Sequence, residues 1–275
     1  MTKSSKGHIM KIILLFILIY LFLILPRLFH KPSRGPLKGY HYAHRGLFDN
    51  NSEAPENSLA AFQKAVDQGY GIELDVQLTK DHQLVVFHDA SLKRMCHIEG
   101  NVWEYTLEEL KQFKLADSDE TIPTFQEVLS VIDGKVPFIL EYKLDRVQTK
   151  VCELANEVLK EYKGPYCIES FHPLALIWYR KNRPDIIRGQ LSMNFYKDGN
   201  KKWFNFFPAY LLTNIATRPD FIAYHHKDSN LSLWLVRKMG ALMVTWTIQS
   251  IDEYKKVKDK YDLFIFDSFV LDQDS

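Results

Sequence analysis

Short apolar runs alternate with helical patterns from Tyr40 to the end of the chain. This alternation predicts parallel strands joined by crossover helices. Strands are expected at residues 40–44, 71–76, 137–142, 165–170, 186–191, 220–224, 242–247 and 262–267. Helices are expected at residues 58–69, 106–113, 124–132, 147–162, 173–182, 229–238 and 250–258. Eight such units predict an α/β fold in which the strands close into a TIM-like (β/α)8 barrel.

One segment, residues 73–88, departs from the alternation. Two extended stretches within it are separated only by a short turn. Because a parallel pairing would need a crossover of about a dozen residues or more, the two stretches must form a hairpin. If Asp75 ends the second barrel strand, the hairpin leaves the top of the barrel and returns to it. His88 then lies beside Glu73 and Asp75.

The N-terminal pattern is different, because residues 12–25 form an unbroken apolar run. With Lys11 and Arg27 reaching toward the membrane surface, residues 9–29 could span a bilayer. A cleaved signal peptide is the main alternative, but no small residues in the pattern of a cleavage site follow the run. A buried core helix is disfavoured because the segment has no polar face. We therefore expect an uncleaved transmembrane helix.

Three segments follow from this pattern: a membrane anchor over residues 1–29, a linker containing Pro and Gly over residues 30–39, and a barrel domain over residues 40–275. The protein is then expected in the cell membrane with a single span. Basic residues flank the apolar run almost equally. Our prediction is that the barrel domain lies on the extracytoplasmic side.

The composition of the chain argues against nucleic-acid binding. The chain is 46% hydrophobic and 25% charged, as expected for a folded domain, and its net charge is only +1 at pH 7. It therefore lacks the broad basic field that nucleic-acid binding requires. We expect a membrane and a small substrate as partners, and no nucleic acid.

Charged residues gather at the predicted carboxyl ends of the first three barrel strands. Residues two apart on one strand face the same side, and the carboxyl ends of barrel strands converge on one site. The residues concerned are His44 and Arg45 on the first strand, Glu73 and Asp75 on the second, and Glu141 and Lys143 on the third. With His88 from the hairpin, they are expected to form one site.

The residue types indicate phosphate chemistry. Unpaired carboxylates gathered in one place are costly, which favours a bound divalent cation, and an all-oxygen ligand set suits Mg²⁺ or Ca²⁺. Arg45 and Lys143 offer fixed positive charge for a phosphate group. His44 and His88 can act as general acid and base because histidine titrates near neutral pH.

Structural explanations exist for single members of this set. One histidine is more often structural than catalytic, and Glu141 with Lys143 could be an ion pair worth little at a surface. Charged residues inside an apolar strand such as residues 136–144 are rarer, however. The complete set has no simple structural explanation, and its convergence is the prediction at risk.

Five segments resemble the glycerophosphodiester phosphodiesterase family, whose members are PLC-like phosphodiesterases with a TIM-like barrel. They are HRG (44–46), PENS (55–58), ELDVQLTKD (73–81), VVFHD (85–89) and EYK (141–143). Each motif alone is weak, but their order and spacing are specific. The resemblance is strong over residues 40–145 and weaker beyond them.

The resemblance implies metal-dependent hydrolysis of glycerophosphodiesters to glycerol 3-phosphate and an alcohol, as part of lipid metabolism. The metal, Mg²⁺ or Ca²⁺, would be held by Glu73, Asp75 and Glu141. The acid and base would be His44 and His88.

The remaining residues that the resemblance implies surround this centre. Arg45 and Lys143 would hold the phosphate, while Glu56, Asn57 and Trp246 would support the site. Asn57 could instead cap the helix that follows it.

The later motifs depart from the family pattern. Gln249 replaces an Asn after the Trp246 stretch, and the last strand keeps Asp267 but not its usual neighbours. These departures leave the substrate alcohol open. A lysophospholipase D is the nearest alternative, and a phosphatidylinositol-type phospholipase C fits the spacing less well. A catalytically inactive, membrane-tethered binding module would have lost at least one charged site residue.

Residues 203–212, WFNFFPAYLL, are unusually aromatic for the rim of a barrel. They could contact lipid, since aromatic side chains favour the membrane interface. Packing within the outer helix layer is the interpretation that we favour.

Overall fold

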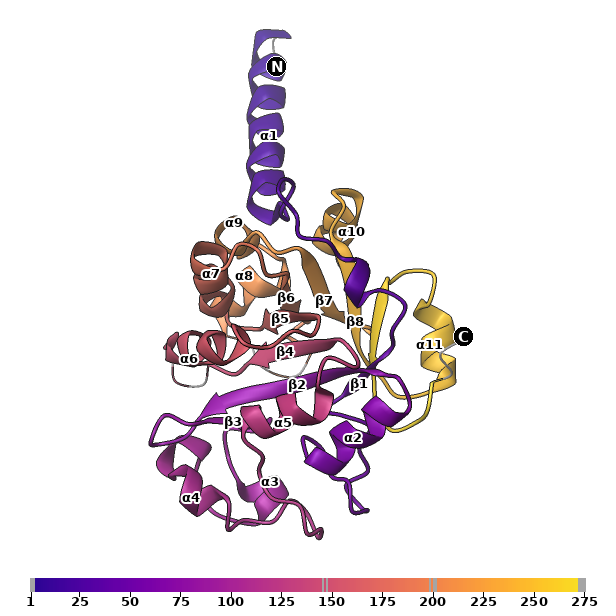
Figure 1. Cartoon of the computed structure of the whole chain (residues 1–275). Coiled ribbons are helices and arrows are strands. Elements are labelled where there is room, and N and C mark those ends of the chain that lie inside the picture. The colour runs from indigo at the N-terminus through magenta and orange to yellow at the C-terminus, as the bar shows by residue number, and fades with distance from the viewer. Residues whose placement is uncertain (1–2, 145, 147, 198, 200–201, 272–275) are drawn as a thin grey trace.

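A computed structural model describes residues 3–144, 146, 148–197, 199 and 202–271 of the chain, and it has the predicted TIM-like barrel (Figure 1). Eight parallel strands pair in the order β1, β9, β8, β7, β6, β5, β4 and β2, and β1 pairs with β2 to close the barrel. These strands are β1 (Tyr42–His44), β2 (Gly71–Leu78), β4 (Phe138–Tyr142), β5 (Tyr166–Ser170), β6 (Arg188–Ser192), β7 (Phe221–His225), β8 (Leu242–Ile248) and β9 (Leu263–Phe266).

Helices surround the barrel and precede it. The longer ones are α1 (Lys3–Ile24), α2 (Leu59–Asp67), α5 (Phe125–Ile132), α6 (Lys150–Leu159), α7 (Pro173–Asn182), α10 (Leu231–Lys238) and α11 (Ile251–Val257). The single-turn helices are η1 (Gly35–Leu37), α3 (Lys93–Cys96), η2 (Val102–Glu104), α4 (Leu107–Leu110), η3 (Trp203–Asn205), α8 (Phe206–Ala209) and α9 (Asn214–Thr217).

The hairpin prediction is confirmed. Strand β3 (Leu84–Val86) runs antiparallel to β2, with Val76 opposite Val86. The backbone N–H of Phe87 donates to the carbonyl oxygen of Asp75 at 3.0 Å. This bond returns the chain to the carboxyl end of β2 just before His88.

Two predicted helices are shorter than expected. The capping box of Thr106 and Glu109 is present, but α4 ends at Leu110. The next residues form turns in which backbone N–H groups donate to the carbonyl oxygen three positions earlier. The Phe113 ring packs edge-on against Tyr105, with 5.3 Å between ring centroids. Tertiary packing therefore ends the helix where local propensity would continue it. The helix expected at residues 147–162 is α6, which covers Lys150–Leu159.

The barrel interior changes character along its axis. Its amino-terminal end is filled by an apolar cluster that includes Leu37, Tyr42, Phe221 and Ile265. Leu37 belongs to the predicted linker, and its carbonyl oxygen accepts a hydrogen bond from the Tyr42 hydroxyl at 2.7 Å. Polar side chains replace apolar ones toward the carboxyl end, which is where barrels bind ligands.

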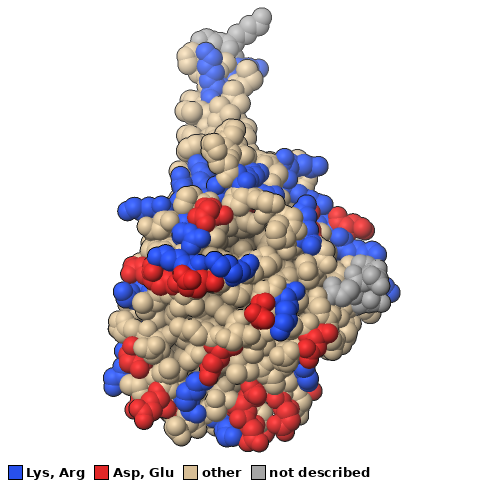
Figure 2. Space-filling view, in the orientation of Figure 1, with Lys and Arg blue, Asp and Glu red and all other residues tan. Residues whose placement is uncertain are grey.

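Helix α1 projects from the side of the barrel (Figure 1). Residues Lys6–Ile24 are long and apolar enough to cross a membrane, by length and composition. Only its last turns pack on the barrel, where Ile24 is fully buried among residues that include Leu211, Ile222 and Met243. In Figure 2, lysine and arginine side chains gather around the base of this helix.

Candidate active site

Three buried carboxylates meet at the carboxyl ends of β2 and β4. Glu73 and Asp75 alternate along β2, and Asp75 lies directly opposite Glu141 of β4 in the strand register. Carboxylate oxygens of the three residues all lie within 4.8 Å of one another, and each residue is at most 6% exposed. The sheet register alone therefore produces the cluster that the sequence predicted.

The electrostatics of this cluster are unfavourable as it stands. Burial, followed by the charges of Asp75 and Glu141, raises the pKa of Glu73 well above its usual range. Burial also raises the pKa of Glu141, although Lys143 opposes this effect. A divalent cation would relieve this repulsion, and three carboxylates within reach of one point fit the all-oxygen ligand set of Mg²⁺ or Ca²⁺. The residues present could therefore hold such an ion.

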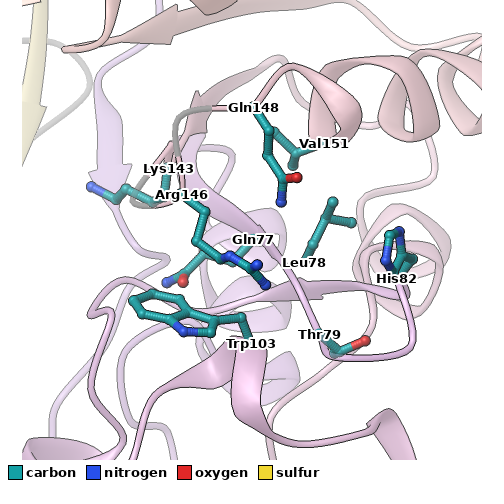
Figure 3. Close-up of a pocket in the computed structure, with 9 residues that line it drawn as sticks. All are labelled: Gln77, Leu78, Thr79, His82, Trp103, Lys143, Arg146, Gln148 and Val151. Atoms are coloured by element: carbon teal, nitrogen blue, oxygen red, sulfur yellow. The ribbon is translucent and has the colours of Figure 1, made fainter.

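Lys143 follows β4 and lies against two of these carboxylates. Its Nζ is 2.6 Å from Oε1 of Glu141 and 3.0 Å from Oδ1 of Asp75. Burial alone would lower the pKa of Lys143. The charges of Asp75 and Glu141 outweigh burial, so the pKa is raised. Lys143 also borders a polar cavity of about 290 Å³ with Arg146 and Trp103, yet in Figure 3 its ammonium points away from Arg146. The Lys143 ammonium therefore pairs with the carboxylates of Asp75 and Glu141.

Arg45 follows β1 in a left-handed conformation, with φ of 55°. Its backbone N–H donates to Oε2 of Glu73 at 3.2 Å, and its Nη1 donates to Oε1 of Glu56 at 2.7 Å. The next residue must be glycine, because a Cβ on Gly46 would lie 2.8 Å from the carbonyl carbon of Ala61. This close approach to α2 fixes the turn that carries the Arg45 side chain into the site.

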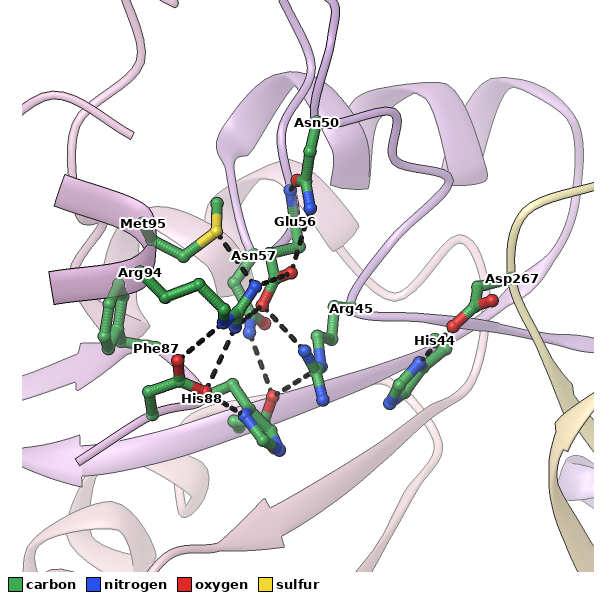
Figure 4. A network of polar contacts seen from close by, with 12 residues as sticks. His44, Arg45, Asn50, Glu56, Asn57, Phe87, His88, Arg94, Met95 and Asp267 are labelled. Carbon is green, nitrogen blue, oxygen red and sulfur yellow. Dashed lines mark hydrogen bonds and ion pairs between the residues drawn. The ribbon is translucent and has the colours of Figure 1, made fainter. Parts of the chain in front are cut away.

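The two histidines lie on either side of Arg45 in Figure 4, and both line one cavity of about 270 Å³ with Glu73 and Glu141. Nδ1 of His44 is 2.8 Å from Oδ2 of Asp267, at the end of β9.

His88 has the same arrangement. Its Nδ1 is 2.6 Å from Oδ1 of Asp89. In both histidines the carboxylate occupies one ring nitrogen, which leaves Nε2 for a ligand. The pKa of His44 is lowered by burial and by Arg45, against the opposing effect of Asp267.

The predicted supporting residues have clear contacts. Asn57 donates from Nδ2 to Oδ2 of Asp75 at 2.9 Å, while Ser58 caps α2 by accepting from Ala61. Asn57 thus contacts the carboxylate cluster, and Ser58 rather than Asn57 caps the helix. Trp246 lines the same cavity as the histidines and packs edge-on against Phe171 at 5.5 Å between centroids.

Sequence reasoning assigned no individual role to three residues that organise the site, which are Gln77, Asp89 and Arg94. Arg94 donates to both carboxylate oxygens of Glu56 at 2.7 Å (Figure 4). It also forms an ion pair with Asp89. Burial alone would raise the pKa of Glu56, but Arg94 and Arg45 bring it to about 2. Gln77 donates from Nε2 to the carbonyl oxygens of Phe87, His88 and Asp89 at 2.8 to 3.1 Å.

Of these three, Gln77 had a detectable signal, because it continues the inward-facing alternation of Glu73 and Asp75. Arg94 lies in the LKR segment after His88, but nothing in the sequence pairs it with Glu56. Asp89 was identified only as part of a motif.

A second, larger cavity adjoins the site. It has a volume of about 860 Å³ and begins at His88, Glu141 and Lys143. Its outer walls are mainly apolar and aromatic, and they include Leu144, Phe171, Phe195, Phe204 and Phe207. A ligand bound at the charged centre could therefore extend a long apolar group into this cavity.

Comparison with known proteins agrees with this arrangement. Residues 44–269 match the glycerophosphoryl diester phosphodiesterase family. A glycerophosphodiester phosphodiesterase of Caldanaerobacter subterraneus is 31% identical over 231 residues, which cover 78% of this chain and 88% of that protein.

A lysophospholipase D of Rattus norvegicus is 32% identical over 157 residues, which cover 52% of this chain and 48% of that protein. Among solved structures, a phosphodiesterase of Oleispira antarctica in complex with the product sn-glycerol-3-phosphate superposes with a TM-score of 0.69. It is 26% identical, and the match covers 84% of this chain and 94% of that one.

Proposed function

Because the chain belongs to the glycerophosphoryl diester phosphodiesterase family and is a phosphoric diester hydrolase, we propose that it hydrolyses glycerophosphodiesters to glycerol 3-phosphate and an alcohol with metal and histidine catalysis. The observation that carries the proposal is one cavity lined by His44, His88, Glu73 and Glu141, with Arg45 at its wall. The glycerol 3-phosphate bound by the Oleispira antarctica relative supports the same product.

Glu73, Asp75 and Glu141 would hold the ion, Mg²⁺ or Ca²⁺. A bound ion would neutralise charge on the phosphodiester and polarise its oxygens. Arg45 and Lys143 would bind the remaining phosphate oxygens, since both are partly buried cations at the edge of the carboxylate cluster. Glu56 and Asn57 would hold Arg45 and Asp75 in position, and Trp246 would form part of the cavity wall.

His44 and His88 would transfer the protons. One histidine takes the proton of the glycerol 2-hydroxyl, whose oxygen bonds to phosphorus, while the other gives a proton to the departing alcohol oxygen. Water then adds to the cyclic phosphate, and the bond between phosphorus and the 2-oxygen breaks. The products are glycerol 3-phosphate and the free alcohol. Asp267 and Asp89 would each hold their histidine in the required tautomer.

Asp267→Asn tests this positioning role. We expect kcat to fall by about one to two orders of magnitude, a fraction of the full acid–base contribution, with little change in KM. The reason is that the neutral amide of asparagine, unlike the carboxylate, carries no negative charge to stabilise the protonated form of His44. Steady-state rates would separate the two constants. A change confined to KM, or a loss of thermal stability that accounts for the rate, would contradict the positioning role.

Hydrolysis by the purified full-length chain in detergent tests the function itself. Glycerophosphocholine, lysophosphatidylcholine and a glycerol-phosphate polymer would be supplied with Mg²⁺ or Ca²⁺, and the products would be identified by ³¹P NMR. We expect glycerol 3-phosphate from glycerophosphocholine. Absence of turnover on all three substrates would contradict the proposal. The same result would favour the inactive binding module, although such a module should have lost at least one charged site residue and all of them are present.

A second candidate, lysophospholipase D activity, is favoured by the apolar cavity that begins at His88 and Lys143. The same two steps on a lysophospholipid would leave the acyl group on the phosphate product. The acyl chain would lie between Leu144, Phe195 and Phe207. Glycerophosphocholine alone would leave these apolar walls in contact with water.

Phe204→Glu at the mouth of this cavity distinguishes the two substrates. We expect the ratio of kcat/KM for lysophosphatidylcholine to kcat/KM for glycerophosphocholine to fall by about tenfold or more, because a charge replaces an apolar contact. In the wild type, kcat/KM should rise with acyl length by up to about fourfold per methylene that enters the cavity. An unchanged ratio together with no dependence on chain length would contradict acyl binding in this cavity.

We further propose that residues 1–29 form a retained single-pass anchor, residues 30–39 join it to the barrel, and residues 40–275 form the extracytoplasmic catalytic domain. Retention is supported by contacts of α1 that a cleaved leader would not need. Nδ2 of Asn214 donates to the carbonyl oxygen of Ile24 at 2.8 Å, and the hydroxyls of Tyr20 and Ser232 are hydrogen-bonded at 2.6 Å. Protease digestion of intact cells, compared with lysed cells, would test the side of the membrane.

A further inference from the structure

Exposed aromatic side chains form a continuous segment beside the large apolar cavity. Trp203 is 76% exposed and Phe204 is 50% exposed, and Phe206, Phe207 and Tyr210 are also exposed. We call these five residues the aromatic rim. The prediction that they pack within the outer helix layer is wrong, because Asn205, Ala209 and Leu211 take the buried positions of the same segment.

The rim lies next to the base of α1. Leu211 and Leu212, directly after the rim, pack in the same apolar cluster as Ile24, Leu21 and Tyr20. In Figure 1, α8 and α9 lie between α1 and strands β5 and β6. If α1 crosses a bilayer, the rim is therefore held close to the membrane surface.

Other exposed apolar residues extend the same face. Ile215 on α9, and Leu231 and Trp234 on α10, are 39%, 63% and 56% exposed. Both helices contact α1. Among the described residues outside α1, most of the exposed large hydrophobic side chains thus gather around the base of α1, and a patch of this kind usually marks an interaction surface.

The charges on this face fit an anionic lipid surface. Nζ of Lys202 is 5.7 Å from the Phe204 ring centroid, and Nζ of Lys238 is 5.9 Å from that of Trp234. Arg218 lies over the Phe22 ring of α1 and donates to the carbonyl oxygen of Leu25. Figure 2 shows that lysine and arginine side chains gather around the base of the helix. Aromatic rings interleaved with cations suit the headgroup layer of a membrane.

The rim and the cavity share residues. Phe204 and Phe207 belong to the rim and also line the cavity that leads to His88 and Lys143. A molecule in the headgroup layer would therefore meet the cavity mouth without first crossing water.

We propose that the aromatic rim docks in the headgroup layer of the anionic phospholipid bilayer that α1 crosses, as a second membrane contact that opens the apolar cavity to amphiphilic substrates in that layer. The supply of substrate through this contact rests on the proposed phosphodiesterase function. The docking itself does not.

Tryptophan quenching tests the docking. The full-length chain and its Trp203→Phe variant would be reconstituted in vesicles of phosphatidylcholine and phosphatidylglycerol, so that their difference in fluorescence reports Trp203. We expect brominated acyl chains to quench this difference and aqueous iodide to have little access to it. Quenching by iodide with no effect of the brominated lipid would overturn the docking, whatever the enzyme hydrolyses.

A kinetic comparison tests the supply of substrate. The double variant Trp203→Glu/Phe206→Glu changes rim residues that do not line the cavity. We expect its kcat/KM for lysophosphatidylcholine embedded in vesicles to fall by about tenfold, with soluble glycerophosphocholine hydrolysed within about twofold of the wild-type rate.

Ile251→Glu is the matched control for this comparison. Ile251 is 42% exposed and lies on α11, which follows β8 rather than β6. It should leave both rates unchanged. Equal effects of the rim variant on both substrates would overturn the supply of substrate through the rim. Absence of turnover on both substrates would instead contradict the proposed function and leave the quenching result to decide the docking.

Discussion

His44→Ala and His88→Ala are each expected to lower kcat/KM for glycerophosphocholine by about three orders of magnitude, the usual size of an acid–base contribution. Each ring has its Nδ1 beside a carboxylate, at 2.8 Å from Asp267 and 2.6 Å from Asp89 respectively, and each lines the charged cavity. Alanine would remove the proposed proton carrier but leave the carboxylates and cations that we propose bind the metal and substrate. The fall should therefore appear mainly in kcat.

Rates of glycerol 3-phosphate release by both variants would be compared with those of His82→Asn. His82 lies in the β2–β3 turn, outside the charged cavity, and its left-handed backbone, with φ of 62°, is one that asparagine tolerates. The control should keep the wild-type rate. The double variant His44→Ala/His88→Ala should be little slower than either single variant, because the two groups act in one step. A loss below about tenfold in either single variant would contradict a role in proton transfer.

Glu73→Gln is expected to separate stability from activity. The pKa of Glu73 is raised well above its usual range by burial and by the neighbouring carboxylates. Without metal, a neutral isostere therefore relieves repulsion, and Tm should stay equal or rise. Activity should nevertheless fall by about two to three orders of magnitude, because the proposed ion, which would stabilise developing charge, would lose a ligand.

Thermal unfolding with and without Mg²⁺ or Ca²⁺ would measure this separation. An ion that binds only the folded protein raises the wild-type Tm, and this rise should be absent in Glu73→Gln. Glu169→Gln is the matched control. Glu169 faces Glu141 across the β4–β5 register, and burial also raises its pKa, but it lies outside the three-carboxylate cluster. A metal-induced rise in Tm that survives Glu73→Gln would contradict the assigned ligand.

The barrel was predictable because its signals are local. Each strand is a short apolar run, and the eight predicted runs correspond to β1, β2 and β4 to β9. The hairpin followed from the length of one turn. Single-turn helices such as α3, α8 and α9 were not predicted, since four residues are too few to display helical spacing.

The charged centre was predictable for a different reason. In a parallel barrel the carboxyl ends of strands converge, so the positions of Glu73, Asp75 and Glu141 on their strands were enough to bring them together. Arg94 was not predictable in this way. Its side chain contacts Glu56, which lies 38 positions earlier in the sequence. The course of the intervening chain brings the two together, and no periodicity specifies that course.

Residues 203–212 illustrate a further limit of hydrophobic patterns. Aromatic content alone does not separate residues that pack in a protein core from residues that face a membrane, because both environments favour the same side chains. The exposure of the rim side chains rules out core packing, and their position next to α1 and at the mouth of the large cavity supports the proposed membrane contact.

The most direct test of the central claim is release of glycerol 3-phosphate from glycerophosphocholine before and after removal of divalent metal with EDTA. The three-carboxylate cluster predicts that release stops in EDTA and returns when Mg²⁺ or Ca²⁺ is added in excess. Release that continues at the same rate in EDTA would contradict a metal-dependent phosphodiesterase built on Glu73, Asp75 and Glu141.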